Sequence, residues 1–334
     1  MTERLAADRE NAKGSKRGPI VVIGSINMDL VCRTPHIPKA GETVLGENLM
    51  TIPGGKGANQ AVAAAKLASG DTPVYLIGRV GDDDFGQRLL VGLSQHGVRT
   101  EFVTITEAAS SGVAMILVDG MGENSIIVVP GANAKLRPRD IDVAEGVIAS
   151  ASAVILQLEI PQETVKHAID LCRRLGVYTI FDPAPAPAKG LSRAMYQVDL
   201  FTPNQSEAEL LLGLEPTHHV KKKRLQDPKQ IAADLLARGP RSVVLKLGAK
   251  GCFRADSDGA LDRARPYKIK VVDTTAAGDA FTAALGIARA EEMEWSDALK
   301  FANAAGAITC MNFGAQPALP GRGAVDKMMK RSRT

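Results

Sequence analysis

Residues 272 to 281 read Val272-Asp273-Thr274-Thr275-Ala276-Ala277-Gly278-Asp279-Ala280-Phe281. The pattern predicts a turn of small residues between a strand over Tyr267 to Val272 and a helix that begins near Gly278. Small residues let a ligand approach the backbone, and the unpaired amides of a helix start favour negative charge. We therefore expect this turn to bind a phosphate or another anion. Asp279 stands among these amides, either as a helix cap or as a base that accepts a proton.

Outward from this turn, short apolar runs alternate with helical patterns along most of the chain. Strands are expected at 20–23, 74–77, 153–158, 178–182, 200–202 and 242–247, and helices at about 162–175, 206–213, 228–238, 279–291 and 296–311. The alternation predicts an α/β fold, a doubly wound and mostly parallel sheet with helices on both faces. This domain would span 19–320, between a disordered N-terminal extension (1–18) and a basic C-terminal tail (321–334).

Two segments interrupt the alternation with patterns typical of small antiparallel strands. Residues 30–53 contain turn residues, prolines and short pieces such as Thr43-Val44-Leu45, and residues 111–130 are typical of a hairpin with its turn near 119–122. The two patches can pair into a small sheet that stands off the main domain. We expect this small β-sheet to act as a lid.

Composition and charge exclude several classes of protein. The formal net charge of +4 is slight and lies partly in the tails, so nothing indicates nucleic-acid binding. The four cysteines form no C-x-x-C pair, which argues against a zinc site or a disulfide framework. No apolar leader or membrane-length run is present, and we expect a cytoplasmic protein without a membrane partner. The basic insertion His218 to Arg224 is predicted to be a surface loop.

Polar residues follow the first predicted strand and the first lid segment. Asn27 and Asp29 come after the apolar run 20–23, at the sheet edge where α/β folds bind ligands. The run 54–59, Gly-Gly-Lys-Gly-Ala-Asn, is rich in glycine but lacks the spacing of a phosphate loop. Its Lys56 and Asn59 are donors that suit a polyhydroxylated small molecule, and a structural turn is the alternative.

Other strand ends carry groups suited to a nucleotide and its metal. Glu159 ends the strand 153–158 and is expected to point into the same crevice. Asn204 and Glu207 stand one helical turn apart, where they can hold hydrated Mg²⁺ or form a capping box, or do both. The small-residue turn 247–251 is open enough for a purine and its phosphates.

These motifs, in this order, resemble the two signature regions of the carbohydrate (PfkB-type) kinase family, which includes ribokinase, adenosine kinase and fructokinase. The resemblance is carried by residues 24–29, 41–43, 54–61 and 273–279, and it spans about Pro19 to Pro320. The motifs are most similar to those of the ribokinases. The resemblance implies Mg²⁺- and ATP-dependent phosphorylation of D-ribose at its primary 5-hydroxyl. The alternatives are a family kinase for another sugar or a nucleoside, and a non-catalytic sugar-binding sensor.

The resemblance also implies roles for individual residues. Asp279 would be the catalytic base, beside an anion hole formed by the amides of Ala276, Ala277 and Gly278. The sugar would be held by Asn27, Asp29, Gly55, Lys56, Asn59, Glu159 and Asp279. The nucleotide would lie on Asn204, Glu207, Lys246, Gly248, Ala249, Gly251, Gly278 and Asn303, with Mg²⁺ bound indirectly by Glu207. An activating K⁺ would lie on Asp273, Thr275, Thr309, Asn312 and Gly314.

The family resemblance further implies a homodimer in which the lid pairs with its twin. Two residues depart from the ribokinase pattern. Asn303 stands where some ribokinases have histidine near the adenine, and Ala318 stands where a serine often contributes to the cation site. Most ligands of the predicted K⁺ would still be backbone carbonyls.

Overall fold

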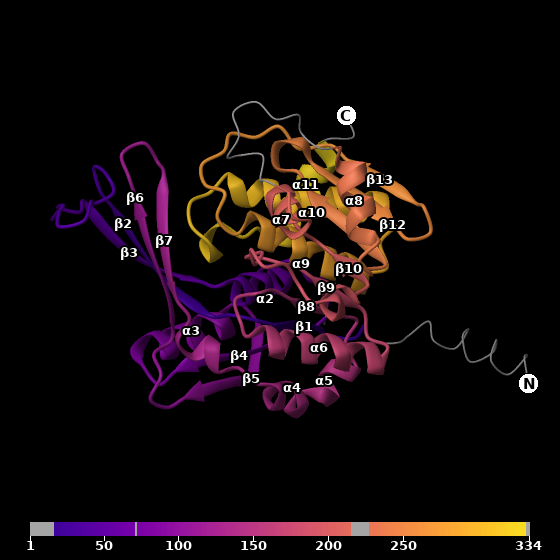
Figure 1. Cartoon of the computed structure of the whole chain (residues 1–334), viewed down its shortest axis with the longest axis horizontal. Coiled ribbons are helices and arrows are strands. Elements are labelled where there is room, and N and C mark those ends of the chain that lie inside the picture. The colour runs from indigo at the N-terminus through magenta and orange to yellow at the C-terminus, as the bar shows by residue number, and fades with distance from the viewer. Residues whose placement is uncertain (1–16, 71, 215–226, 332–334) are drawn as a thin grey trace, which may run out of the picture.

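The computed structural model describes residues 17–70, 72–214 and 227–331. Its main body is an α/β domain, and a small sheet stands off from it (Figure 1). Residues 1–16 of the predicted disordered extension lie outside the described residues. The basic insertion His218 to Arg224 also lies outside them.

The central sheet of the described chain has nine strands in the order β13-β12-β11-β10-β9-β8-β1-β4-β5. Their bounds are β1 Ile20–Ile23, β4 Val74–Gly81, β5 Val98–Thr106, β8 Ala153–Leu156, β9 Thr179–Phe181, β10 Leu200–Phe201, β11 Ser242–Lys246, β12 Cys252–Asp256 and β13 Leu261–Ala264. The seven strands β11, β10, β9, β8, β1, β4 and β5 pair with one another in parallel, whereas β12 pairs antiparallel with both β11 and the edge strand β13. The predicted doubly wound, mostly parallel sheet is thereby confirmed.

Helices cover both faces of this sheet (Figure 1). They are α2 Lys56–Leu67, α3 Asp84–Gln95, α4 Pro138–Val143, α5 Glu145–Ala149, α6 Gln162–Leu175, α7 Gln205–Leu211, α8 Pro228–Leu236, α9 Ala277–Ala290, α10 Trp295–Cys310 and α11 Arg322–Arg331. Because side chains alternate along a strand, Ile20 and Val22 of β1 face the core under α2, α9 and α10, whereas Val21 and Ile23 face the core under α4, α6 and α8. None of the described helices is long and apolar enough to cross a membrane.

The small sheet predicted from residues 30–53 and 111–130, which we name the lid after its predicted role, is present with four strands in the order β3-β2-β6-β7. Its strands are β2 Asn27–Arg33, β3 Asn48–Gly54, β6 Gly112–Val118 and β7 Asn124–Val129. The hairpin of β6 and β7 is confirmed, and the two patches join through a parallel pairing of β2 with β6. Residues 43–45 are not a strand, contrary to the prediction, because β3 pairs with β2 only from Asn48 onward.

The strand predicted over Tyr267 to Val272 is wrong. The chain there has no strand pairing and runs from β13 toward the turn at 273–279. No described strand lies beside this segment to pair with it, because the preceding edge strand β13 ends at Ala264 and pairs only with β12. The segment instead lines a cavity beside α9 and α10.

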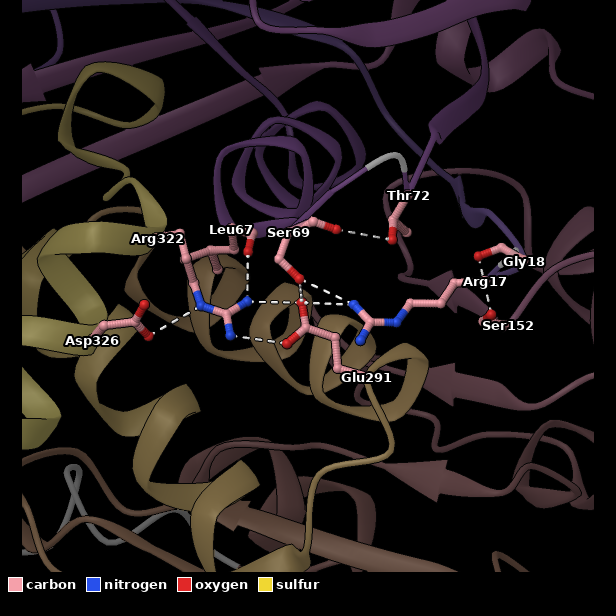
Figure 2. A network of polar contacts seen from close by, with 9 residues as sticks. All are labelled: Arg17, Gly18, Leu67, Ser69, Thr72, Ser152, Glu291, Arg322 and Asp326. Atoms are coloured by element: carbon pink, nitrogen blue, oxygen red, sulfur yellow. Dashed lines mark hydrogen bonds and ion pairs between the residues drawn. The ribbon is translucent and has the colours of Figure 1, made fainter. Parts of the chain in front are cut away.

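The C-terminal segment also differs from the predicted solvated tail, because α11 packs against the domain and buries Val325 completely. Figure 2 shows how a polar network secures this helix. The guanidinium of Arg322 donates to both carboxylate oxygens of Glu291, at 2.8 and 2.9 Å, and Ser69 donates to the same carboxylate. Arg17 donates to Ser69 at 3.0 Å, so this network ties residue 17 and the ends of α2 and α9 to α11.

Candidate active site

Asp279 lies in the first turn of α9, at the edge of the sheet where the strands end, and only 5% of it is exposed. Its carboxylate accepts hydrogen bonds from Nδ2 of Asn59 at 3.0 Å and from Nε2 of Gln60 at 3.1 Å. These donors belong to α2, so the carboxylate is bound across a helix interface, while Ala276 occupies the N-cap position of α9. Burial, with the charges of Asp182 and Glu159, raises the pKa of Asp279, although Lys56 opposes the shift. The group is well placed to accept a proton.

The turn before Asp279 has the geometry of an anion site. Ala276 adopts a left-handed conformation with φ of 59°, and α9 begins at the next residue. A non-glycine residue in this region is strained, which is typical of functional turns. The amides of Ala277 and Gly278 belong to the first turn of α9. The N–H of Ala277 donates to the carbonyl of Thr274 at 3.3 Å, whereas the N–H of Gly278 has no acceptor among the described residues, as is usual at a helix start.

Lys56 and Glu159 come together with Asp279 on the lid side of the sheet. The backbone N–H of Lys56 donates to Oε2 of Glu159 at 3.1 Å, and Ser25 Oγ donates to the same oxygen at 2.6 Å. Burial acts to lower the pKa of Lys56, but the carboxylates of Asp279 and Glu159 outweigh it and raise the pKa. Lys56 therefore stays charged beside the carboxylates of Asp279 and Glu159.

Asp29 lies on lid strand β2 and is 8% exposed. Burial, followed by repulsion from Glu159 and Asp279, raises its pKa to about 7. Among the described residues, no side-chain or backbone donor forms a hydrogen bond to its carboxylate. A buried acid of this kind is prepared to accept hydrogen bonds from a ligand.

Asn27 lies where the body joins the lid. Its Oδ1 accepts from Nδ2 of Asn133 at 2.8 Å, and Asn133 also exchanges two hydrogen bonds with the backbone of Ile26. Gly55 packs so closely on this backbone that an added Cβ would lie 2.6 Å from the amide nitrogen of Asn27, and its φ is 85°. Only glycine fits there, and the contact places Asn27 beside the start of α2.

Oδ1 of Asn59 is a buried atom beside Asp279 that has no hydrogen-bond partner among the described residues. Nδ2 of the same side chain donates to Asp279. An orphaned buried acceptor is costly, so a ligand hydroxyl that donated to it would be favoured.

A cavity of about 670 Å³ opens on the other side of the α9 turn. Six of the predicted nucleotide residues line it: Lys246, Gly248, Ala249, Gly251, Gly278 and Asn303. Its other walls include Tyr267, Ile269 and Phe281, which give it a mostly apolar surface suited to a flat aromatic base. Asn303 donates to the carbonyls of Ala264 and Arg265, so it holds the rim of the cavity in place.

Asn204 and Glu207 form the predicted capping box. Oδ1 of Asn204 accepts from the backbone N–H of Glu207, and Oε2 of Glu207 accepts from that of Asn204, both at 2.8 Å. Burial and the charge of Asp182 raise the pKa of Glu207, while Lys246 opposes the shift. The carboxylate therefore stands in an acidic cluster that gains from a nearby cation.

The predicted cation residues lie on two loops that touch. Asp273 accepts from the backbone and hydroxyl of Thr275, at 2.9 and 2.7 Å, and from the backbone N–H of Gly314 at 2.9 Å. Burial acts to raise the pKa of Asp273, but the bonds from Thr275 and Gly314 outweigh it and lower the pKa. Thr309 lies in the last turn of α10, and Asn312 follows the end of that helix. The carbonyl of Thr309 already accepts from the backbone N–H of Asn312 at 3.1 Å. Asp29, Asp273 and Gly314 also line a shared cavity of about 590 Å³.

Sequence reasoning missed three buried polar residues that organise this site. Gln60 donates from Nε2 to both Asp279 and Asp182, Asp182 is 1% exposed, and Asn133 fixes the start of the lid. Each lies in an apolar or helical stretch, where a polar residue is unremarkable in sequence. Their partners are 64 to 219 positions away, as with Asp182 and Lys246 or Gln60 and Asp279.

Comparison with known proteins agrees with this arrangement. The profile of the pfkB family of carbohydrate kinases matches residues 18–322. The ribokinase of Schizosaccharomyces pombe is 39% identical over 90% of this chain and 94% of its own length, and that of Bacillus subtilis is 38% identical over 93% and 99%. The structure of Arabidopsis thaliana ribokinase complexed with ribose and ATP superposes with a TM-score of 0.86, at 31% identity, and covers 94% of this chain and 99% of that one. The buried Asp279, the α9 turn and the likeness to these kinases along nearly the whole chain lead to one conclusion: the protein belongs to the pfkB family of carbohydrate kinases.

Proposed function

We propose that the protein is an ATP-dependent ribokinase, which transfers the γ-phosphoryl group of ATP to the 5-hydroxyl of D-ribose. The observation that carries the proposal is the position of Asp279. It lies between a cluster of buried polar groups suited to a sugar and a largely apolar cavity suited to a nucleotide. The ribokinase relatives, which match the chain nearly end to end, support ribose as the acceptor.

In the proposed reaction, Asp279 accepts the proton of the attacking sugar hydroxyl. The oxygen forms a bond to the γ-phosphorus while the bond from that phosphorus to the bridging oxygen of ADP breaks. The hydrogen bonds from Asn59 and Gln60 fix the base in place, and the first amides of α9 face the charge on the phosphoryl group. Phosphoryl transfer depends mainly on such positioning and on charge stabilisation.

The sugar would be held by groups that have spare hydrogen-bonding capacity. The carboxylate of Asp29 and Oδ1 of Asn59 are acceptors without a described partner, and Lys56 and Asn27 add donors. An arrangement of alternating acceptors and donors suits several adjacent hydroxyls. The lid strand β2 carries two of these groups, so we infer that closure of the lid excludes water from the reaction.

Two metal ions belong to the proposal. Mg²⁺ bound to the phosphates would neutralise their charge, and the buried Glu207 stands in an acidic cluster that favours a cation. An activating K⁺ would be held by the Asp273 carboxylate and by backbone oxygens of Thr275, Thr309, Asn312 and Gly314. Carboxylate and carbonyl oxygens form a donor set suited to such a cation, and the Asp273–Gly314 contact joins the two loops that supply it.

We also propose that the protein forms a homodimer through the lid. All six residues of β7 are exposed, and Ile126, Ile127, Val128 and Val129 among them are apolar. A second copy would cover this edge strand, which is otherwise a hazard for unspecific association. A mass near twice that of one chain in light scattering supports the dimer, and a monomer at micromolar concentration contradicts it. Location in the cytoplasm stays a prediction from the sequence.

An ADP-release assay with ribose, deoxyribose, fructose and adenosine, each with and without K⁺, tests the function. The proposal expects the highest kcat/KM with ribose and a clear rise on adding K⁺. ADP release with another acceptor but not with ribose would remove the substrate assignment and leave a family kinase. Absence of turnover with every acceptor, together with tight sugar binding, would favour a sensor.

A further inference from the structure

A buried ion pair between Lys246 and Asp182 lies at the border of the nucleotide cavity. Nζ of Lys246 is 2.8 Å from Oδ1 of Asp182, and the two side chains are 12% and 2% exposed. Lys246 is the last residue of β11, and its backbone N–H donates to the carbonyl of Pro203 at 3.0 Å. The ammonium group therefore extends from a rigid strand end.

The ammonium also lies against the proposed anion hole. A Cβ built on Gly278 would lie 3.5 Å from Nζ of Lys246, in ordinary van der Waals contact. Gly278 belongs to the first turn of α9, one residue before Asp279, and both Lys246 and Gly278 line the nucleotide cavity. A phosphoryl group bound to these amides would thus meet a positive charge.

Asp182 connects this charge to the base. Its Oδ2 accepts from Thr282 Oγ1 at 3.2 Å and from Gln60 Nε2 at 3.3 Å, and the same Gln60 nitrogen donates to Asp279. Asp182 is held from three sides, so it is a fixed counter-charge for Lys246 when no phosphate is present. A buried lysine without a counter-charge would be costly, which explains the pairing.

We propose that Lys246 is a further catalytic residue of the phosphoryl transfer, which contacts the γ-phosphoryl oxygens and offsets the charge of the transition state. Asp182 is the positioning residue that holds the ammonium beside Gly278. The inference rests on the proposed kinase function and adds a role that is absent from it. Preorganised charges aimed at a developing charge act mainly on kcat, because they bind the transition state better than the ground state.

The competing explanation is that Lys246 only neutralises Asp182. Both explanations expect Lys246→Gln to destabilise the protein, since it leaves a buried carboxylate unpaired. The double variant Asp182→Asn/Lys246→Gln separates them, because it removes both charges and keeps two side chains that can hydrogen-bond. Lys300→Gln is the control for the loss of one lysine charge, since Lys300 pairs with Asp297 at 3.0 Å in an exposed ion pair, and neither residue lines the nucleotide cavity.

The experiment compares kcat, KM for ATP, ADP affinity and melting temperature for these variants, using the acceptor that the wild type phosphorylates best. We expect the double variant to regain the melting temperature that Lys246→Gln loses and still to show kcat about 100-fold below wild type. ADP affinity should change by less than about threefold. A double variant with a kcat near wild type would overturn the proposal, as would a folded Lys246→Gln variant with undiminished kcat. If the wild type phosphorylates another acceptor but not ribose, the result counts against the proposed substrate and not against the role of Lys246.

Discussion

Asp29→Asn should make the protein more stable at alkaline pH and worse at binding its sugar. The carboxyl of Asp29 titrates near pH 7 in the folded protein, compared with 3.8 as its ordinary value. Between these values the folded state binds more protons than the unfolded state, so the free energy of unfolding falls as the pH rises through this window. Above pH 7 this loss of unfolding free energy has reached its full value. A shift of about 3 pKa units corresponds to about 4 kcal/mol, as an upper estimate.

The asparagine variant lacks this titration, so its stability relative to wild type should rise with pH. From pH 5.5 to pH 8 the gain should reach about 2 kcal/mol, because roughly half of the linkage lies in that interval. Urea unfolding at both pH values measures the difference, and any fixed offset from the amide cancels. Asp258→Asn, the same substitution on an exposed turn, controls for the loss of one negative charge.

The same variant should raise KM for ribose about tenfold or more, because a hydrogen bond to a charged group contributes about 1.5–3 kcal/mol. A stability difference that stays constant from pH 5.5 to pH 8 would show that Asp29 is already ionised in the folded protein at the lower pH. An unchanged KM would remove Asp29 from the sugar site. A variant that gains stability and loses affinity would identify Asp29 as a residue kept for function at a cost in stability.

Three other substitutions test separate parts of the site and the fold. Asp279→Asn should lower kcat by about 10²- to 10⁴-fold while sugar affinity, measured by calorimetry, is retained; near wild-type turnover would exclude Asp279 as the base. Gly278→Ala would place a methyl group, in ordinary contact with Nζ of Lys246, in the space proposed for the phosphoryl group, so kcat/KM for ATP should fall about 100-fold with no loss of melting temperature; unimpaired ATP use would mean that the phosphates lie elsewhere. Arg322→Gln removes both bonds to Glu291 and should cost about 1–3 kcal/mol in urea unfolding, whereas the exposed Lys327→Gln should stay within about 0.5 kcal/mol; equal effects would contradict the role of the network in Figure 2.

Local patterns in the sequence determined most of the architecture. Apolar runs of strand length that alternate with helical patterns predicted the doubly wound sheet, and α6 and α8 begin at or next to the predicted residues. The hairpin of β6 and β7 and the capping box of Asn204 and Glu207 were also predictable, because turn chemistry and capping depend on residues a few positions apart. The prediction over Tyr267 to Val272 failed because a β-type composition does not supply a neighbouring strand to pair with.

For the candidate site, the sequence by itself identified Asp279, the small-residue turn and the polar strand ends, and the family resemblance supplied their roles. Only the tertiary structure decided that Gln60 binds Asp279, that Asp182 pairs with Lys246, and that α11 is docked through Arg322 and Glu291. The physical reason is that a buried polar contact depends on which distant segments the fold brings together. In a one-dimensional sequence Gln60 is an ordinary residue of an alanine-rich helix, and its meaning appears only when α2 packs against α9.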